Sequence, residues 1–352
     1  MAAKKKVVKR TDTRKKTARK QPEPSPAPAP DQSPPQPSKG DVAPQATTPP
    51  PKPKNITNRD LIDTLFQAFG PEGTSQQQSK GKSSVRRYLK QVLDKHPISA
   101  SFNVVMLYDE TRMVQSDADN IYSAVTTFAE KKPVLLILHS SGGFVGPAYL
   151  IGKMLHEYSN GALDIAVPRR AKSGATLLCC AANHIHMGSL SELGPIDPQF
   201  EGMPALGLKS AIQHIAELVA EYPHATELLA KYMSESIQPI HLGYYERVAE
   251  SAAQYAERLL RPHKATLGQD PAKIAKDLVY SYKDHGFVID KQEAQAIFGD
   301  KIVLHNTDEY NLANSLYQAL GFVSRIMDFV NHDFYMIGSV ASEPGFIKRR
   351  KN

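Results

Sequence analysis

Residues 101–187 alternate short apolar runs with amphipathic stretches, and this alternation constrains the fold more than any other feature of the chain. The apolar runs FNVVMLYD, PVLLILHS, LDIAVP and IHMG have the length and composition of buried strands. The stretches between them have the apolar spacing of helices. Strands that alternate with helices are typical of right-handed crossover units in a mostly parallel sheet. We therefore predict an α/β fold.

Composition divides the chain into four segments. In residues 1–54, ten Lys or Arg residues stand within the first twenty positions, and 13 of the 26 prolines follow in residues 21–54. Such a segment cannot bury a core, so we predict a disordered basic and then Pro-rich tail. Residues 55–100 hold two helical stretches and are predicted as an N-terminal arm. The main domain is expected over 101–335, and a C-terminal tail over 336–352.

The formal net charge of +7 belongs to the N-terminal tail, because the rest of the chain is close to neutral. Only residues 4–20 therefore favour a nucleic-acid or other acidic partner. The N-terminus lacks the apolar segment of a secretory signal, and the chain holds no charge-free apolar run of about 18 residues. We expect no membrane span and a cytoplasmic protein. Cys179 and Cys180, adjacent in an apolar helix, are interpreted as core residues of a reducing compartment.

Three turns stand where a strand ends and a helix begins, which is where active sites in parallel sheets gather. These turns are Ser140-Ser141-Gly142-Gly143, Lys172-Ser173-Gly174 and the Pro-containing loop LGPIDPQ at 193–199. Ser173 is expected to cap the following helix, and the free N–H groups at that helix start could also hold an oxyanion. Taken singly, each turn also has an ordinary structural explanation as a cap or a tight turn.

The order and spacing of the turns resemble the ClpP/crotonase superfamily of serine peptidases and, within it, the serine dehydrogenase proteinase family, relatives of SppA. The matching motifs are SSGG, then KSGAT about thirty residues on, LGPIDPQ about twenty residues later, and DHGFVIDKQEA at 284–294. The resemblance covers about residues 100–305. It implies a ClpP/crotonase-like spiral of ββα units with added C-terminal helices. It also implies a peptide or protein substrate and a homo-oligomer, with no cofactor.

The resemblance places the nucleophile at Ser173 and the oxyanion-holding N–H groups at Gly174 and at Gly142 or Gly143. Deprotonating a serine needs a base nearby. His285, oriented by Asp197, is the preferred base, with His and Asp exchanged relative to the order in ClpP. A Ser–Lys dyad of the SppA type is the alternative. Its candidate bases are Lys209 and Lys231, whereas Lys172 is expected to point away from the site.

Two other functions remain open at this point. One is an acyl-CoA enzyme of the crotonase type, which would use paired backbone N–H groups without the serine. The other is a catalytically inactive scaffold that binds nucleic acid through its basic tail. No metal site is predicted, because His184 and His186 alternate on a strand without a third ligand at suitable spacing.

Overall fold

The computed structural model describes residues 55–197, 199–200, 203–236 and 239–349. The predicted N-terminal tail and its candidate partner-binding residues 4–20 lie outside this part. Residues 53–352 form one compact unit. Its centre is a nine-stranded sheet, within which seven strands follow the order β11-β10-β1-β2-β3-β5-β9.

The middle of the sheet is parallel, as the alternation predicts. β1 (Asn103–Asp109), β2 (Val134–Ser140) and β3 (Leu163–Val167) pair in parallel, and β5 (His184–Met187) and β9 (Val303–Leu304) continue the sheet. The helices α3 (Gln115–Val125), α4 (Val145–Tyr158) and α5 (Gly174–Cys179) lie in the connections between β1 and β5.

Two short strands next to the predicted serine pair with the sheet outside its main strand order. β4 (Arg170–Ala171) pairs in parallel with the end of β2 and with β6 (Glu192–Leu193). β3 is thus followed by the short strand β4 before α5, whereas the segments after β1 and β2 meet only in an isolated bridge between Met113 and Gly143. This topology confirms the predicted α/β fold.

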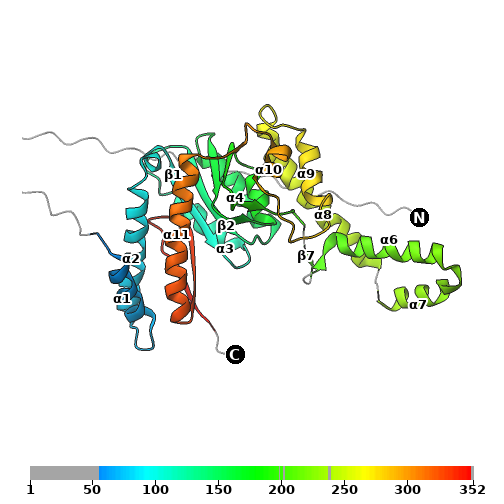
Figure 1. Ribbon diagram of the computed structural model, residues 1–352, viewed down its shortest axis with the longest axis horizontal. Coiled ribbons are helices and arrows are strands. Elements are labelled where there is room, and N and C mark those ends of the chain that lie inside the picture. The colour runs from blue at the N-terminus through cyan, green and yellow to red at the C-terminus, as the bar shows by residue number, and fades with distance from the viewer. Residues whose placement is uncertain (1–54, 198, 201–202, 237–238, 350–352) are drawn as a thin grey trace, which may run out of the picture. The chain divides into compact units, whose positions relative to one another are not determined.

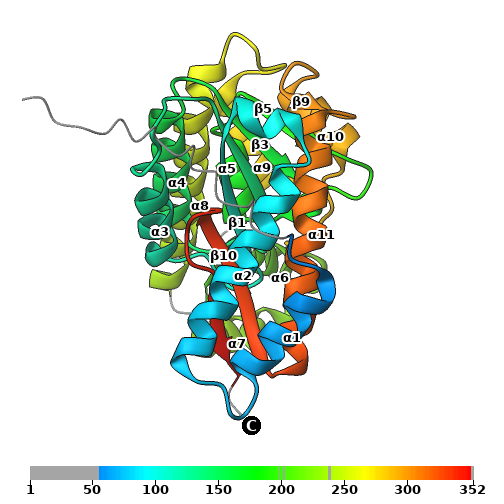
Figure 2. The ribbon, with the colours of Figure 1, turned by 90° about the vertical axis from the view of Figure 1, so that its left-hand side faces the viewer.

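Both faces of the sheet are covered by helices. Successive side chains of a strand point to opposite faces, so one strand contributes to both cores. In β1, Val105 and Leu107 join one core cluster, whereas Met106 and Tyr108 join the other. The first cluster lies under α4, α5, α8 (Pro239–Leu260) and α9 (Pro271–Tyr280). The second lies under α1 (Asn58–Phe69), α2 (Ser75–Leu93) and α11 (Asp308–Phe329). Figure 2 shows α2 and α11 side by side in front of the sheet.

The helices of the predicted N-terminal arm pack into the core. α1 and α2 each begin with a capping box, Thr57 with Asp60 and Thr74 with Gln77. Leu61, Leu65, Leu89 and their neighbours are fully buried against α11 and the sheet. Residues 55–93 therefore belong to the main domain and do not form a separate arm.

The predicted C-terminal tail is wrong. β10 (His332–Ser339) pairs antiparallel with β1, and β11 (Gly345–Lys348) pairs antiparallel with β10. Apolar residues such as Met336 and Ile337 supply burial on both faces of β10. Because the domain boundary at 335 cuts through this strand, the domain extends to at least Lys348.

The remaining elements follow β6. They are β7 (Gln199–Phe200), β8 (Met203–Pro204), α6 (Ala205–Glu221), α7 (Thr226–Ser236) and α10 (Lys291–Phe298). Figure 1 shows α6 and α7 at the right, with α8 and α9 between them and the sheet. No helix among the described residues is long and apolar enough to cross a membrane.

Candidate active site

Ser173 occupies a strained turn between β4 and α5. Its backbone has φ 50° and ψ −117°, in the left-handed half of the map that non-glycine residues rarely adopt. Such outliers cluster at active sites, because the surrounding structure must hold them. Ser173 stands at the N-cap position, but its side chain makes no capping hydrogen bond. The predicted capping role of the hydroxyl is therefore wrong.

The glycine turn after β2 packs directly against the serine turn. Gly142 has φ 93° and Gly143 has φ 156°. A Cβ at Gly142 would lie 2.4 Å from the carbonyl oxygen of Lys172 and 2.9 Å from Cβ of Ser173. Glycine is therefore required there by both conformation and space. The N–H of Gly142 donates to Oγ of Ser140 at 3.1 Å, so Gly143 is the better-placed oxyanion donor beside Gly174.

A pocket of about 620 Å³ opens in front of Ser173. Apolar side chains and the glycine turn form most of its wall, and charged groups stand at its edge. His285 lines the same pocket, so the structure brings the predicted nucleophile and base to one cavity. The lining residues are Glu110, Thr111, Arg112, Ser141, Gly142, Gly143, Phe144, Val145, Gly146, Ser173, Tyr244, Val248 and His285.

Asp197 stands behind His285. Its Oδ2 lies 3.7 Å from Nδ1 of His285, and the Asp197 side chain is 10% exposed. Both Nδ1 of His285 and Oδ1 of Asp197 are buried without a hydrogen-bond partner. A buried polar atom without a partner is costly, and Oδ2 of Asp197 is the acceptor that stands nearest to Nδ1 of His285 among the ion pairs of this ring.

The segments that carry these two residues are tied together by backbone hydrogen bonds. Leu193 and Ile289 exchange N–H···O bonds of 2.9 and 3.1 Å. The N–H of Ile196 donates to the carbonyl oxygen of Leu278 at 2.9 Å. The positions of Asp197 and His285 therefore depend on each other.

Of the two predicted lysine bases, only Lys231 has a described side chain, and it does not lie beside Ser173. Lys231 is exposed in α7 and does not line the pocket. Lys209 falls in α6, at a position whose side chain lies outside the described residues. Lys172 points away from the pocket, as the sequence predicts, and its Nζ makes a 3.2 Å ion pair with Glu192.

Sequence reasoning missed the carboxylate at the pocket edge. Glu110 accepts a 2.7 Å hydrogen bond from Nε2 of His139 and pairs with Arg170 through its other oxygen. Burial, together with the charge of Arg169, lowers the pKa of His139 to about 4, so the ring is neutral at pH 7 and donates from Nε2. Glu110 directly follows β1, and that strand end was the available signal.

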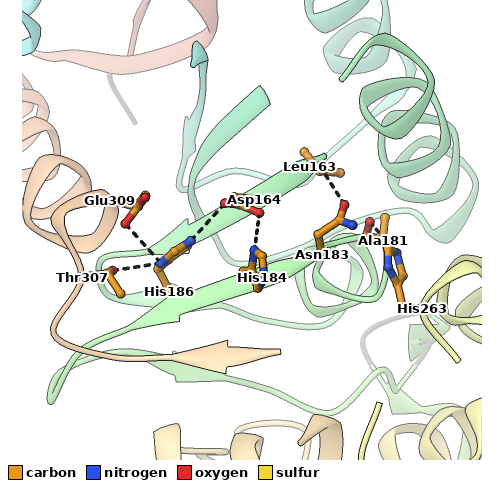
Figure 3. Close-up of polar contacts among 9 residues, drawn as sticks. All are labelled: Leu163, Asp164, Ala181, Asn183, His184, His186, His263, Thr307 and Glu309. Atoms are coloured by element: carbon orange, nitrogen blue, oxygen red, sulfur yellow. Dashed lines mark hydrogen bonds and ion pairs between the residues drawn. The ribbon is translucent and has the colours of Figure 1, made fainter. Parts of the chain in front are cut away.

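His184 and His186 have structural partners, as Figure 3 shows. Nδ1 of His184 lies 2.9 Å from Asp164, and Nδ1 of His186 lies 2.9 Å from Oγ1 of Thr307. His186 also stands 3.5 Å from Asp164 and 3.8 Å from Glu309. Within the described residues, no group of three or more His, Cys, Asp or Glu side chains is arranged to hold a metal ion.

Comparison with known proteins bears on this geometry. Residues 102–241 match the family of ClpP-like, SDH-type serine proteinases. The recognition made from the sequence is thereby confirmed for this segment, which holds Ser173, Asp197 and the glycine turn. His285 lies beyond the matched residues.

Two curated relatives come from Methanocaldococcus jannaschii. The uncharacterized protein MJ0137 is 28% identical over 182 residues, which are 51% of this chain and 57% of the relative. The uncharacterized protein MJ1495 is 28% identical over 148 residues, or 41% of this chain and 49% of the relative. The chain thus spans about half the length of the curated relatives that it matches.

Solved structures with similar folds include two proteases at low identity. A mutant of ClpP1 from Listeria monocytogenes has a TM-score of 0.36 and 15% identity, covering 63% of this chain and 98% of its own. A mutant of the 1510-N membrane-bound stomatin-specific protease, in complex with a substrate peptide, has a TM-score of 0.38 and 12% identity. It covers 71% of this chain and 89% of its own.

Proposed function

We propose that this protein is a serine peptidase whose nucleophile is Ser173, with His285 as general base and Asp197 as the group that orients it. The family match supports a serine peptidase at the level of the family. One observation carries the assignment of the site. Ser173 has a strained backbone, makes no capping bond and shares a pocket with His285 and the glycine turn.

The strained turn favours nucleophilic attack because it presents Oγ to the pocket. The side-chain oxygen of a capping serine accepts a hydrogen bond from an N–H group of its own helix. Here the oxygen makes no such bond, and the residue adopts φ 50°, which costs on the order of 1–3 kcal/mol. Strained backbone conformations of this kind cluster at active sites, which supports a catalytic role for the Ser173 hydroxyl.

In the proposed reaction, Oγ of Ser173 attacks the scissile carbonyl carbon while His285 takes the hydroxyl proton. The N–H groups of Gly143 and Gly174 hold the oxyanion that forms. His285 then gives that proton to the departing amine nitrogen, which leaves an acyl-serine. Water, deprotonated by His285, attacks the acyl carbon, and the proton returns to Ser173 Oγ as the acid product departs.

Asp197 would stabilise the imidazolium that forms in each step. Its Oδ2 lies 3.7 Å from Nδ1 of His285, so its negative charge stands beside the ring that becomes positive during the reaction. Hydrogen bonds in unliganded active sites are often long and shorten in the complex with substrate. The contact therefore fits an orienting role before substrate binds.

The decisive experiment is labelling of the purified full-length chain with a fluorophosphonate, followed by peptide mapping. We expect one labelled peptide that contains Ser173, and no labelling of Ser173→Ala. Ser123→Ala, on α3 and away from the pocket, is the matched serine control. His285→Ala should lower the labelling rate by about 10²–10⁴.

The same experiment separates the alternatives. Undiminished labelling of His285→Ala would move the role of base to a lysine. A folded wild-type protein that never labels would overturn the peptidase and favour the inactive scaffold or an acyl-CoA enzyme, which CoA binding would distinguish.

We also propose that the protein forms a homo-oligomer, as the family resemblance implies. Light scattering after size-exclusion chromatography measures the mass directly. A mass equal to the 38.8 kDa of one chain at micromolar concentration would contradict the proposal.

A further inference from the structure

The residue before the nucleophile, Lys172, is largely buried and does not line the pocket. Its side chain is 14% exposed, and its ammonium reaches three acceptors. Nζ donates to the carbonyl oxygen of Phe287 at 3.1 Å and to that of Leu193 at 3.3 Å. The third acceptor is Oε2 of Glu192, at 3.2 Å. Two of its donors are thus used in hydrogen bonds to backbone carbonyls, and Glu192 balances its charge.

Each acceptor belongs to a segment that carries a residue of the proposed site. Phe287 follows His285 by two positions in the same turn, and Leu193 begins the loop that leads to Asp197. Lys172 itself is covalently joined to Ser173. A single side chain thus connects the nucleophile turn, the base loop and the Asp197 loop.

The surroundings are shaped to admit this side chain. A Cβ at Gly194 would lie 2.5 Å from Cδ of Lys172, so glycine leaves the space through which the lysine stem passes. The N–H of Gly194 donates to Oγ1 of Thr176 at 3.1 Å, and that hydroxyl donates to the carbonyl oxygen of Ala171 at 2.7 Å. Through Thr176, these two bonds connect Gly194, which borders the Lys172 stem, to Ala171, the residue before Lys172.

We infer that Lys172 is a positioning residue, which fixes the distance and orientation of His285 relative to Ser173. The inference rests on the proposed function, since it gives Lys172 a role only if His285 is the base. Lys172 is not assigned as the base, because its ammonium is held by two carbonyl oxygens and Glu192, and its side chain does not line the pocket.

The variant Lys172→Met keeps a stem of similar length and removes the donors. We expect the second-order rate of fluorophosphonate labelling at Ser173 to fall about 10–100-fold, because displacements on the order of 1 Å cost about that much. Lys172→Arg, which keeps a cation and several donors, should restore part of the rate. Lys82→Met removes a lysine that also makes a long-range ion pair, with Glu343 at 2.9 Å, and should label like the wild type.

The dependence of the rate on pH separates positioning from a loss of folded protein. In the wild type the labelling rate should level off once the base is neutral. When His285 no longer reaches Ser173, the rate should keep rising with hydroxide concentration. A merely structural role would scale the whole profile down without changing its shape.

Each outcome decides a different point. If the wild type labels and Lys172→Met shows the same labelling rate at every pH, the proposed role of Lys172 is overturned. The proposed peptidase function then still stands. A scaled profile of unchanged shape would overturn the role of Lys172 too. If Lys172→Met does not fold, Gly194→Ala decides by the same two criteria, because it displaces the stem and keeps the ammonium. A wild type that never labels would overturn the proposed function first, and this role with it.

Discussion

Oδ2 of Asp197 lies 3.7 Å from Nδ1 of His285, within ion-pair range and beyond hydrogen-bonding distance. The contact joins the loop after β6 to the turn before α10. On the proposed mechanism it selects the ring tautomer that leaves Nε2 free to accept the serine proton.

The first prediction concerns this pair. Asp197→Asn should lower kcat for a peptide substrate by about 10²–10⁴ while KM changes little, because the amide favours the wrong tautomer and cannot stabilise the imidazolium. Asp94→Asn removes an exposed carboxylate at the end of α2 and serves as the control. A kcat within a factor of about three of the wild-type value would exclude Asp197 from the mechanism.

The second prediction concerns the glycine turn. Gly142→Ala places a Cβ 2.4 Å from the Lys172 carbonyl oxygen at a φ of 93°, so the turn must move. We expect labelling of Ser173 to fall at least about 10-fold and stability to drop by about 1–3 kcal/mol. Gly243→Ala, in α8 with open space around it, should leave labelling unchanged and raise stability by up to about 1 kcal/mol. Normal labelling of Gly142→Ala would separate this turn from the chemistry.

The third prediction follows from the buried ring of His139, whose pKa is lowered from 6.5 to about 4. Between these two values the unfolded chain binds a proton that the native state does not, so stability falls as the pH decreases from 6.5 towards 4. The loss attributable to His139 approaches about 3 kcal/mol. Urea unfolding of the wild type and His139→Gln over this range measures it. Gln preserves a donor towards Glu110 and does not titrate, so parallel curves for the two proteins would contradict the prediction.

The fourth prediction concerns Cys179 and Cys180, which are free and each 1% exposed. Burial raises the pKa of the Cys179 thiol to about 12 and that of Cys180 well above its ordinary range. Neither thiol should react with an aromatic disulfide reagent in the native protein at pH 8, because the thiolate is the reactive form. Both should react in guanidinium. Rapid native reaction of either would show that α5 opens.

The parallel core could be predicted from the sequence because strands such as VLLILHS are apolar throughout and have helical connections. The C-terminal strands could not be predicted in the same way. The burial of β10 depends on its pairing with β1, which is distant in sequence. The helices α1 and α2 were recognised as helices, but their burial depends on α11, which lies far along the chain.

The candidate site shows the same division. The turns at strand ends pointed to Ser173 and to the Gly142-Gly143 pair, whereas His285 was assigned only through the resemblance to the serine dehydrogenase proteinase family. The φ of Ser173 was not predictable, since β4 and the packing of the glycine turn create that strain. Lys172 was set aside on direction alone, and its three acceptors come from segments distant in sequence.

The pairing of β1 with β10 has a consequence for synthesis. β1 is among the first parts of the sheet to leave the ribosome, and its outer partner is among the last. Until β10 arrives, an apolar strand stays open at one edge, which is the kind of surface that pairs with other chains. The strand also leads into the pocket wall at Glu110. A nascent chain would therefore assemble this wall only near the end of translation, after the serine turn had already been made.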